Sequence, residues 1–163
     1  MITDRDLGFK RIYQEALKLE DTVVKVGILA SAKFVKVPGQ KDSPSIATTA
    51  AWNEFGITPA NAPRIPARPA HRIAFDSNLT QINKRIVNLY NKVLEQKATA
   101  TTAAETLGKY HVGNIKRSIT DLKFPPNAPY TIARKKSSNP LIDTEQTRGA
   151  VTFELVTRAE ANL

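Results

Sequence analysis

The 163-residue chain contains no cysteine, and it has no long apolar run. Without cysteine there is no disulfide, no cysteine-ligated zinc and no cysteine nucleophile. No apolar stretch approaches the roughly 18 residues that a membrane helix needs. The N-terminus carries charge within its first few residues, unlike a secretory signal peptide. We therefore expect a soluble protein that is made in a cytoplasm and does not bind a membrane.

Histidine is also scarce, and the common catalytic patterns are missing. The only histidines, His71 and His111, have no His, Asp or Glu partner at helical ligand spacing, which argues against a metal site. Asp143 lies close to Glu145, but an Asp before Thr144 is more typical of a cap or turn than of acid–base catalysis. No glycine-rich phosphate loop is present. The sequence thus predicts no enzyme activity, no cofactor, no metal and no small-molecule ligand.

Aromatic residues make up only 7% of the chain, and they do not alternate with the basic residues. This disfavours single-strand or sequence-specific binding of nucleic acid, which uses aromatic side chains as stacking platforms. Basic residues, however, outnumber acidic ones by 24 to 15, for a net charge of +9. Such a charge favours a polyanion or an acidic protein surface as partner. A merely solubilising surface charge is the alternative, and non-specific contact with duplex DNA stays open.

Two stretches near opposite ends of the chain have the pattern of β-strands. Residues 22–30 and 149–158 alternate their apolar side chains and are rich in β-branched residues. Helical patterns occupy the chain between them. We expect a single α+β domain over residues 1–163, with a small antiparallel or mixed sheet packed against one long helix plus shorter helices, and with long extended loops.

Helix signals begin near the N-terminus. Residues 3–20 repeat their apolar positions with helical spacing. Pro44 and Ser45 are well placed to start a short helix that runs to Phe55, and Gly56 is well placed to cap it. Trp52 and Phe55 lie on one face of this helix, where core packing is favoured over an interface anchor.

The strongest helical pattern follows Pro69. Its apolar residues recur in alternating steps of four and three, as in a helix packed along a sheet or a neighbouring helix: Phe75, Leu79, Ile82, Ile86, Leu89 and Val93. Residues 97–105 are low in complexity and fit either a break or a continuation. A further helix is expected to end near Asp121, although Gly108 and Gly113 weaken it.

Two segments carry a resemblance to a known family. The first signature segment, residues 50–72, reads AAWNEFGITPANAPRIPARPAHR, and the second signature segment, residues 125–155, reads PPNAPYTIARKKSSNPLIDTEQTRGAVTFEL. In order and spacing they resemble the "NEFG … IPARPF" and "PLIDTG" patterns of tail-completion and head–tail joining (neck) proteins of long-tailed double-stranded DNA bacteriophages. The resemblance covers roughly residues 22–157. It departs at Ala70, where the family has Phe, and at Glu145, where the family has Gly.

The resemblance implies a structural virion protein at the head–tail junction, made in the host bacterial cytoplasm. It implies a ring, expected to be a homohexamer, that caps the head-proximal end of the tail around the DNA channel. Its neighbours would be the tail terminator and the head connector or head-closure protein. A tail terminator that stops tail-tube growth, or a basic DNA-binding accessory protein, is the alternative function.

On this interpretation, three loops rich in proline or basic residues, 31–44, 56–69 and 124–144, are assembly segments. Prolines reduce the entropy lost when a loop docks, and arginines suit pairing with carboxylates of a neighbouring subunit. A ring needs two different patches per subunit, and residues 52–72 and 124–148 are the expected ones.

The expected interface residues are Trp52, Asn53, Glu54, Phe55, Arg64, Pro66, Arg68, Pro69, Asn127, Asp143 and Thr144. The residues expected to contact channel DNA or an acidic partner are Lys33, Lys36, Lys41, Arg134, Lys135 and Lys136.

Overall fold

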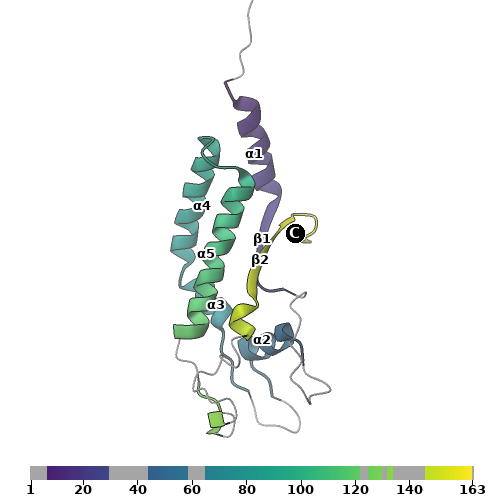
Figure 1. The fold of residues 1–163 in the computed structure, drawn as a ribbon, viewed down its shortest axis with the longest axis vertical. Helices are drawn as coiled ribbons and strands as arrows, with labels where there is room; N and C mark the ends of the chain where they lie inside the picture. The colour runs from purple at the N-terminus through teal and green to yellow at the C-terminus, as the bar shows by residue number, and fades with distance from the viewer. Residues whose placement is uncertain are drawn as a thin grey trace, which may run out of the picture.

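Helices dominate the fold, and α4 and α5 lie on one side of one small sheet (Figure 1). The computed structural model describes residues 7–29, 44–58, 65–121, 125–129, 132–133 and 146–162. The elements in chain order are α1 (Phe9–Asp21), β1 (Thr22–Ile28), α2 (Ile46–Phe55), α3 (Ala70–Asp76), α4 (Leu79–Leu94), α5 (Ala100–Asp121), α7 (Gln146–Gly149) and β2 (Val151–Thr157). This confirms the predicted α+β class.

The sheet consists of β1 and β2, which pair antiparallel although they come from opposite ends of the chain. Their register places Val26 opposite Phe153 and Lys25 opposite Glu154. Because side chains alternate along a strand, the first pair faces α5 and the second faces away. The alternation of apolar residues seen in the sequence therefore marks the face that the long helix covers.

The longest helix is α5, with 22 residues, and it contacts both strands. Gly108 lies where the two layers approach most closely: a Cβ added there would come within 2.5 Å of the Phe153 ring. Gly113, one and a half turns further on, has no neighbour within 4 Å of the position of a Cβ. The two glycines that weaken the helix signal thus differ, because only Gly108 makes room for the sheet.

The helix that the sequence predicts after Pro69 is divided into two. The helix α3 ends at Asp76, a turn at Ser77 and Asn78 follows, and α4 begins at Leu79. The Ser77 and Asn78 amides donate to carbonyl oxygens of Ile73 and Phe75, which ends α3. Consequently α5, and not this region, supplies the long helix that lies along the sheet.

The apolar seam of α3 and α4 is only partly used. Ile82 and Val93 are buried, whereas Phe75, Leu79 and Ile86 each keep more than two fifths of their surface exposed. One edge of the seam packs on α5, and the other edge faces outward. The helical spacing was thus correct, but it overestimated how much of the seam a neighbour covers.

The short helix α2 forms as its flanking residues predict. Ser45 accepts a hydrogen bond on its Oγ from the Thr48 amide at 3.0 Å, which satisfies a donor of the first turn. At the other end Gly56 adopts a positive φ of 70°, and its amide donates to the Trp52 carbonyl at 2.9 Å. Residues 1–6, which include the start of the helix predicted over residues 3–20, lie outside the described residues.

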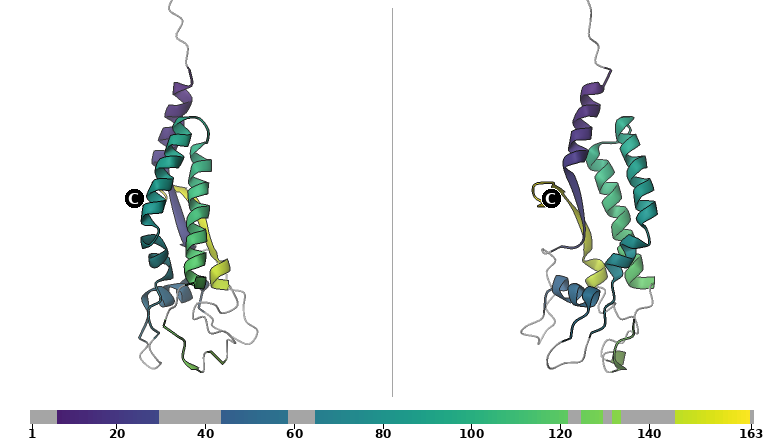
Figure 2. Two further views of the ribbon diagram at one scale, coloured as in Figure 1. Left: turned by 90° about the vertical axis from the view of Figure 1, so that its left-hand side faces the viewer. Right: turned by 180° about the vertical axis from the view of Figure 1, so that it is seen from behind.

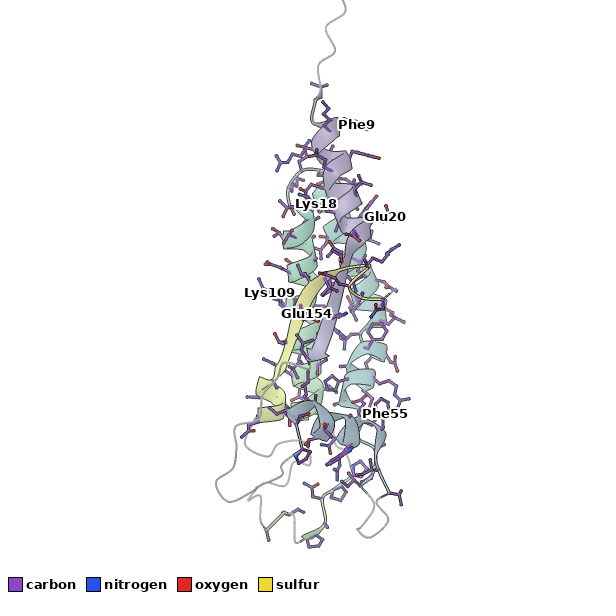
Figure 3. All side chains as sticks on the ribbon, turned by 90° about the vertical axis from the view of Figure 1, so that its right-hand side faces the viewer. Phe9, Lys18, Glu20, Phe55, Lys109 and Glu154 are labelled. Carbon is purple, nitrogen blue, oxygen red and sulfur yellow. The ribbon has the colours of Figure 1, made fainter. Side chains whose placement is uncertain are left out.

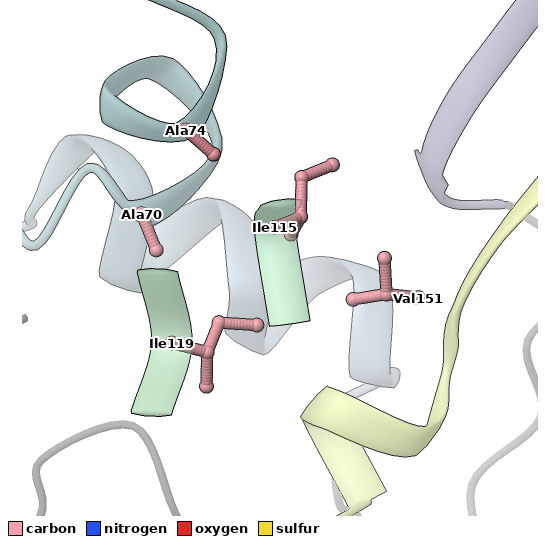
Figure 4. Close-up of a cluster of buried hydrophobic side chains, with 5 residues drawn as sticks. All are labelled: Ala70, Ala74, Ile115, Ile119 and Val151. Atoms are coloured by element: carbon pink, nitrogen blue, oxygen red, sulfur yellow. The ribbon is translucent and has the colours of Figure 1, made fainter. Parts of the chain in front are cut away.

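The molecule is elongated (Figures 1 and 2), and one cluster of its buried apolar side chains lies near the end of α5 and the start of β2. The core cluster joins α3, α5 and the start of β2, as Figure 4 shows. Its members are Ala70, Ala74, Ile115, Ile119 and Val151. We call the end of the molecule below this core, formed by α2, residues 65–69 and residues 125–129, the base.

Glycine substitutions test the contact between helix and sheet. Replacing Gly108 by alanine is expected to lower the free energy of unfolding by about 1–3 kcal/mol, because the added methyl group overpacks against Phe153. The matched change Gly113→Ala, in the same helix but in open space, is expected to raise it by about 0.5–1 kcal/mol. Urea unfolding measures both. Equal effects of the two changes would contradict the packing shown here.

Candidate functional site

The structure brings described parts of the two signature segments together at the base. Eight of the predicted interface residues are described: Trp52, Asn53, Glu54, Phe55, Pro66, Arg68, Pro69 and Asn127. The other predicted residues lie outside the described residues: Arg64, Asp143, Thr144, Lys33, Lys36, Lys41, Arg134, Lys135 and Lys136. The prediction of two separate patches changes accordingly, since the described residues of the two segments adjoin one another.

Arg68 makes the contact between the segments. Its side chain is 4% exposed. Its Nε donates to the Pro125 carbonyl at 3.0 Å, and one terminal nitrogen donates to the Pro126 carbonyl at 3.3 Å. The other terminal nitrogen donates to Oδ1 of Asn53 at 3.3 Å, and the Arg68 amide donates to the Asn53 carbonyl at 2.6 Å. One side chain thus holds together α2, the proline-rich loop and the start of the second segment.

This geometry corrects the role predicted for Arg68. The sequence suggested pairing with a carboxylate of a neighbouring subunit, but the guanidinium points into its own chain and binds neutral oxygens. Burial lowers the pKa of Arg68, yet an arginine stays charged in a protein. A buried cation needs fixed acceptors, because an unpaired buried charge costs several kcal/mol. Arg68 is therefore a structural residue of the base.

Arg68 substitutions should destabilise the fold. Arg68→Ala removes three charged hydrogen bonds and leaves two proline carbonyls unpaired, so we expect the free energy of unfolding to fall by about 2–4 kcal/mol. Arg68→Lys keeps the charge but loses the planar fork of donors, and we expect a smaller loss of about 1–2 kcal/mol. Chemical denaturation measures both. Stability unchanged in Arg68→Ala would contradict the structural role.

Glu54 organises the start of α3. Its two carboxylate oxygens accept hydrogen bonds from the amides of His71, at 3.0 Å, and Arg72, at 2.9 Å. The His71 ring nitrogen Nδ1 lies 3.3 Å from the same carboxylate. Burial opposes the charge, but these hydrogen bonds from His71 and Arg72 outweigh it and lower the pKa of Glu54. A carboxylate placed there caps the helix and complements its dipole.

The proline-rich loop is closed at its ends by main-chain bonds. Ile57 and Ile65 exchange two hydrogen bonds, at 3.0 and 2.9 Å, as an isolated antiparallel bridge. Gly56 precedes this bridge with a positive φ, and a Cβ at that position would lie 2.8 Å from the Ala67 amide nitrogen. Only glycine fits there without a shift of the backbone. Asn53 and Glu54, which the sequence places in the expected interface, are thus hydrogen-bonded within the chain at the base of this loop.

Trp52 and Phe55 are surface residues. Trp52 is 36% exposed and Phe55 is 74% exposed. The sequence favoured core packing for both, and for Phe55 this was wrong, because α2 ends at the base with Phe55 directed away from the sheet (Figure 3). A large exposed aromatic side chain is a common feature of binding surfaces.

His111 introduces a pH dependence that sequence spacing did not reveal. His111 is partly buried and packs edge-on against Phe75, with ring centroids 5.7 Å apart. Burial, and then the charge of nearby His71, lower the pKa of His111. A residue pair such as Glu54 and His71 is 17 positions apart, so no helical or strand spacing signals it.

Acid should therefore destabilise the protein in two steps. His111 and Glu54 both have lowered pKa values in the folded state, so the unfolded state binds more protons as pH falls. The free energy of unfolding is expected to decrease first near the ordinary histidine value of about 6.5, and again near the ordinary glutamate value of about 4.3.

Two substitutions separate the steps. His111→Phe should remove the decrease between neutral pH and pH of about 5, whereas Glu54→Gln should leave that step and reduce the lower one. Denaturant unfolding at a series of pH values measures this. An unchanged slope above pH 5 in His111→Phe would contradict the assignment.

Among the described residues, no group of three or more His, Cys, Asp or Glu side chains could hold a metal ion. Of the helices that the structure describes, none has the length and hydropathy to cross a membrane. What the described residues provide is a hydrogen-bonded loop base beside an exposed aromatic residue.

Comparison with known proteins found no relative of this chain. No protein-family model matches it, and no curated protein or solved structure is significantly similar to it.

Proposed function

We propose that this chain is a structural virion protein of a long-tailed bacteriophage. It forms a ring, of expected homohexameric symmetry, that completes the head-proximal end of the tail and joins it to the head connector. The proposal begins from the resemblance of the two signature segments. The observation that carries it is the base itself, where residues from both segments form one hydrogen-bonded unit.

Each position of the signature has a distinct task in that unit. Asn53 accepts from Arg68, Glu54 caps α3, and Gly56 allows the loop to begin. Phe55, between them, has no such internal task and stays exposed. A pattern of this kind is expected when internal bonds fix a loop so that one side chain and the adjoining surface bind a partner. We assign the base to contact with the neighbouring virion ring.

A basic DNA-binding protein is the second candidate, and the observation that favours it is α4. This helix has no acidic residue in 16 positions, and it carries Lys84, Arg85 and Lys92. All three residues are exposed, and Arg85 and Lys92 lie on one flank of α4. The Arg85 guanidinium is held 4.0 Å above the Tyr110 ring. In a ring, the same face would line a DNA channel with diffuse charge without reading sequence; in a free protein, it would bind duplex DNA with strong salt dependence.

Electron microscopy of a phage lysate lacking this gene tests the function. Filled heads beside separate tails of normal length are the expected result. Tails of uncontrolled length would instead identify a tail terminator. Intact infectious particles would contradict both structural functions and leave the DNA-binding candidate, which salt-dependent binding of duplex DNA by the purified protein then tests.

Complementation in the same lysate tests the role of the base. A gene carrying Phe55→Asp is expected to leave heads and tails unjoined, because a charged side chain replaces an exposed aromatic anchor. Gln14→Asp, which adds the same charge at an exposed position of α1, is the matched control and should restore joined particles. Full activity of Phe55→Asp would overturn the assignment of the base.

A further inference from the structure

The half of the molecule away from the base contains an open apolar groove. It lies between α1, β1, α4 and α5 and has a volume of about 560 Å³. Its rims include Tyr13 and Leu17 on α1 and Ile86 and Tyr90 on α4, and Leu107 of α5 lies in its lining. The rim side chains are between 44% and 57% exposed. A soluble chain rarely leaves so continuous an apolar surface without a partner.

Helix α1 forms one rim of this groove. None of its 13 residues is fully buried, although its apolar side chains fall on one side. Glu15 fixes it to the body by accepting a hydrogen bond from the Ala100 amide at 2.6 Å, and Lys18 pairs with the same carboxylate group. Polar contacts thus position the α1 rim, while Tyr13 and Leu17 on its apolar side stay exposed.

The same helix also presents an apolar tip. Leu7 and Phe9 are 83% and 74% exposed, and the Phe9 ring stacks against Tyr13 with centroids 6.3 Å apart. Gly8, between them, lies against Gln96 in the turn that joins α4 to α5. The tip therefore stands at the end of the molecule opposite Phe55, as the labels in Figure 3 show. We call residues 7–10 the tip.

Charge distinguishes the tip from the groove. Lys10 is an exposed residue of the tip, and Arg11 follows it. The only charged residue that lines the groove is Glu20, and within the described residues no ion pair includes it. A groove with one unpaired carboxylate in an apolar lining suits an apolar segment that carries a positive charge. The tip of this same chain is such a segment.

We propose that the groove binds the tip of a second copy of this chain, with Phe9 in the apolar lining and Lys10 beside Glu20. The inference rests on the proposed ring function and assigns one of its subunit contacts. Tip and groove are different surfaces of one molecule, so the contact is heterologous, and its repetition closes a ring when the rotation permits. It also leaves the base free for the neighbouring virion ring.

Self-association of the purified full-length protein tests this directly. Wild type is expected to form complexes of more than two copies in native mass spectrometry and analytical ultracentrifugation. Phe9→Glu in the tip and Tyr90→Glu in the groove should each lower the association constant at least about thirtyfold, the effect of losing an aromatic hot spot. The matched controls Gln14→Glu and Asn88→Glu add the same charge on the polar faces of the same helices and should associate as wild type does.

Mixing the two defective variants distinguishes a tip-in-groove contact from general loss of folding. Because the Phe9 ring stacks on Tyr13 of the groove, the mixture uses Leu7→Glu as its tip variant. Leu7→Glu keeps an intact groove and Tyr90→Glu keeps an intact tip, so together they should form a complex of one copy of each and stop there. A charge exchange gives a second test. Glu20→Lys should weaken association, and adding Lys10→Glu in the same chain should restore it, which a merely structural effect would not do.

Several results would overturn the inference. These are a wild-type protein that stays monomeric, a complex that stops at two copies, variants no weaker than their controls, or a mixture that does not combine. A groove that takes only another virion protein would also overturn it. These outcomes concern the purified protein, whereas the lysate without the gene tests the head–tail function, so either proposal can fail while the other stands.

Discussion

The buried guanidinium of Arg68 is the constraint on which the base depends. A cation removed from water needs oxygen acceptors at fixed positions, and here Asn53, Pro125 and Pro126 supply them. These acceptors come from α2 and from a segment that begins 57 residues after Arg68, so all of them must be in place together. With these acceptors in place, Glu54 accepts hydrogen bonds from the His71 and Arg72 amides at the start of α3. The bridge between Ile57 and Ile65 fixes the distance between the ends of the proline-rich loop.

Burial is divided unevenly along the molecule, and the division corresponds to two kinds of surface. Near the base, α3, α5 and β2 enclose a compact core of small and branched side chains. In the other half, α1 and α4 stand apart and leave an apolar groove between them. The closed core holds the loop base in place. The open groove leaves apolar surface exposed, and burying that surface favours association. One end is thus suited to a fixed docking surface and the other to contact between copies.

Local chemistry made much of the fold predictable. Ser45 and Gly56 delimit α2 through capping, and the β-branched alternation marks both strands, because these signals act over a few residues. The division at Ser77 was not predictable, since the apolar spacing continues across it. Residues 97–105 were equally open between a break and a continuation: the helix breaks after Leu94, and α5 begins at Ala100, whose amide donates to Glu15 of α1.

The sequence by itself determined the class of fold, the strand faces and the absence of cysteine chemistry, because propensity, alternation and composition are properties of neighbouring residues. Tertiary structure decided the rest. It turned Arg68 inward and left Phe55 outside, which spacing along the chain does not distinguish. It also left a groove open beside α1. Whether an apolar helix face is covered depends on where elements from distant parts of the sequence end in space, and those positions are set only when the chain has folded.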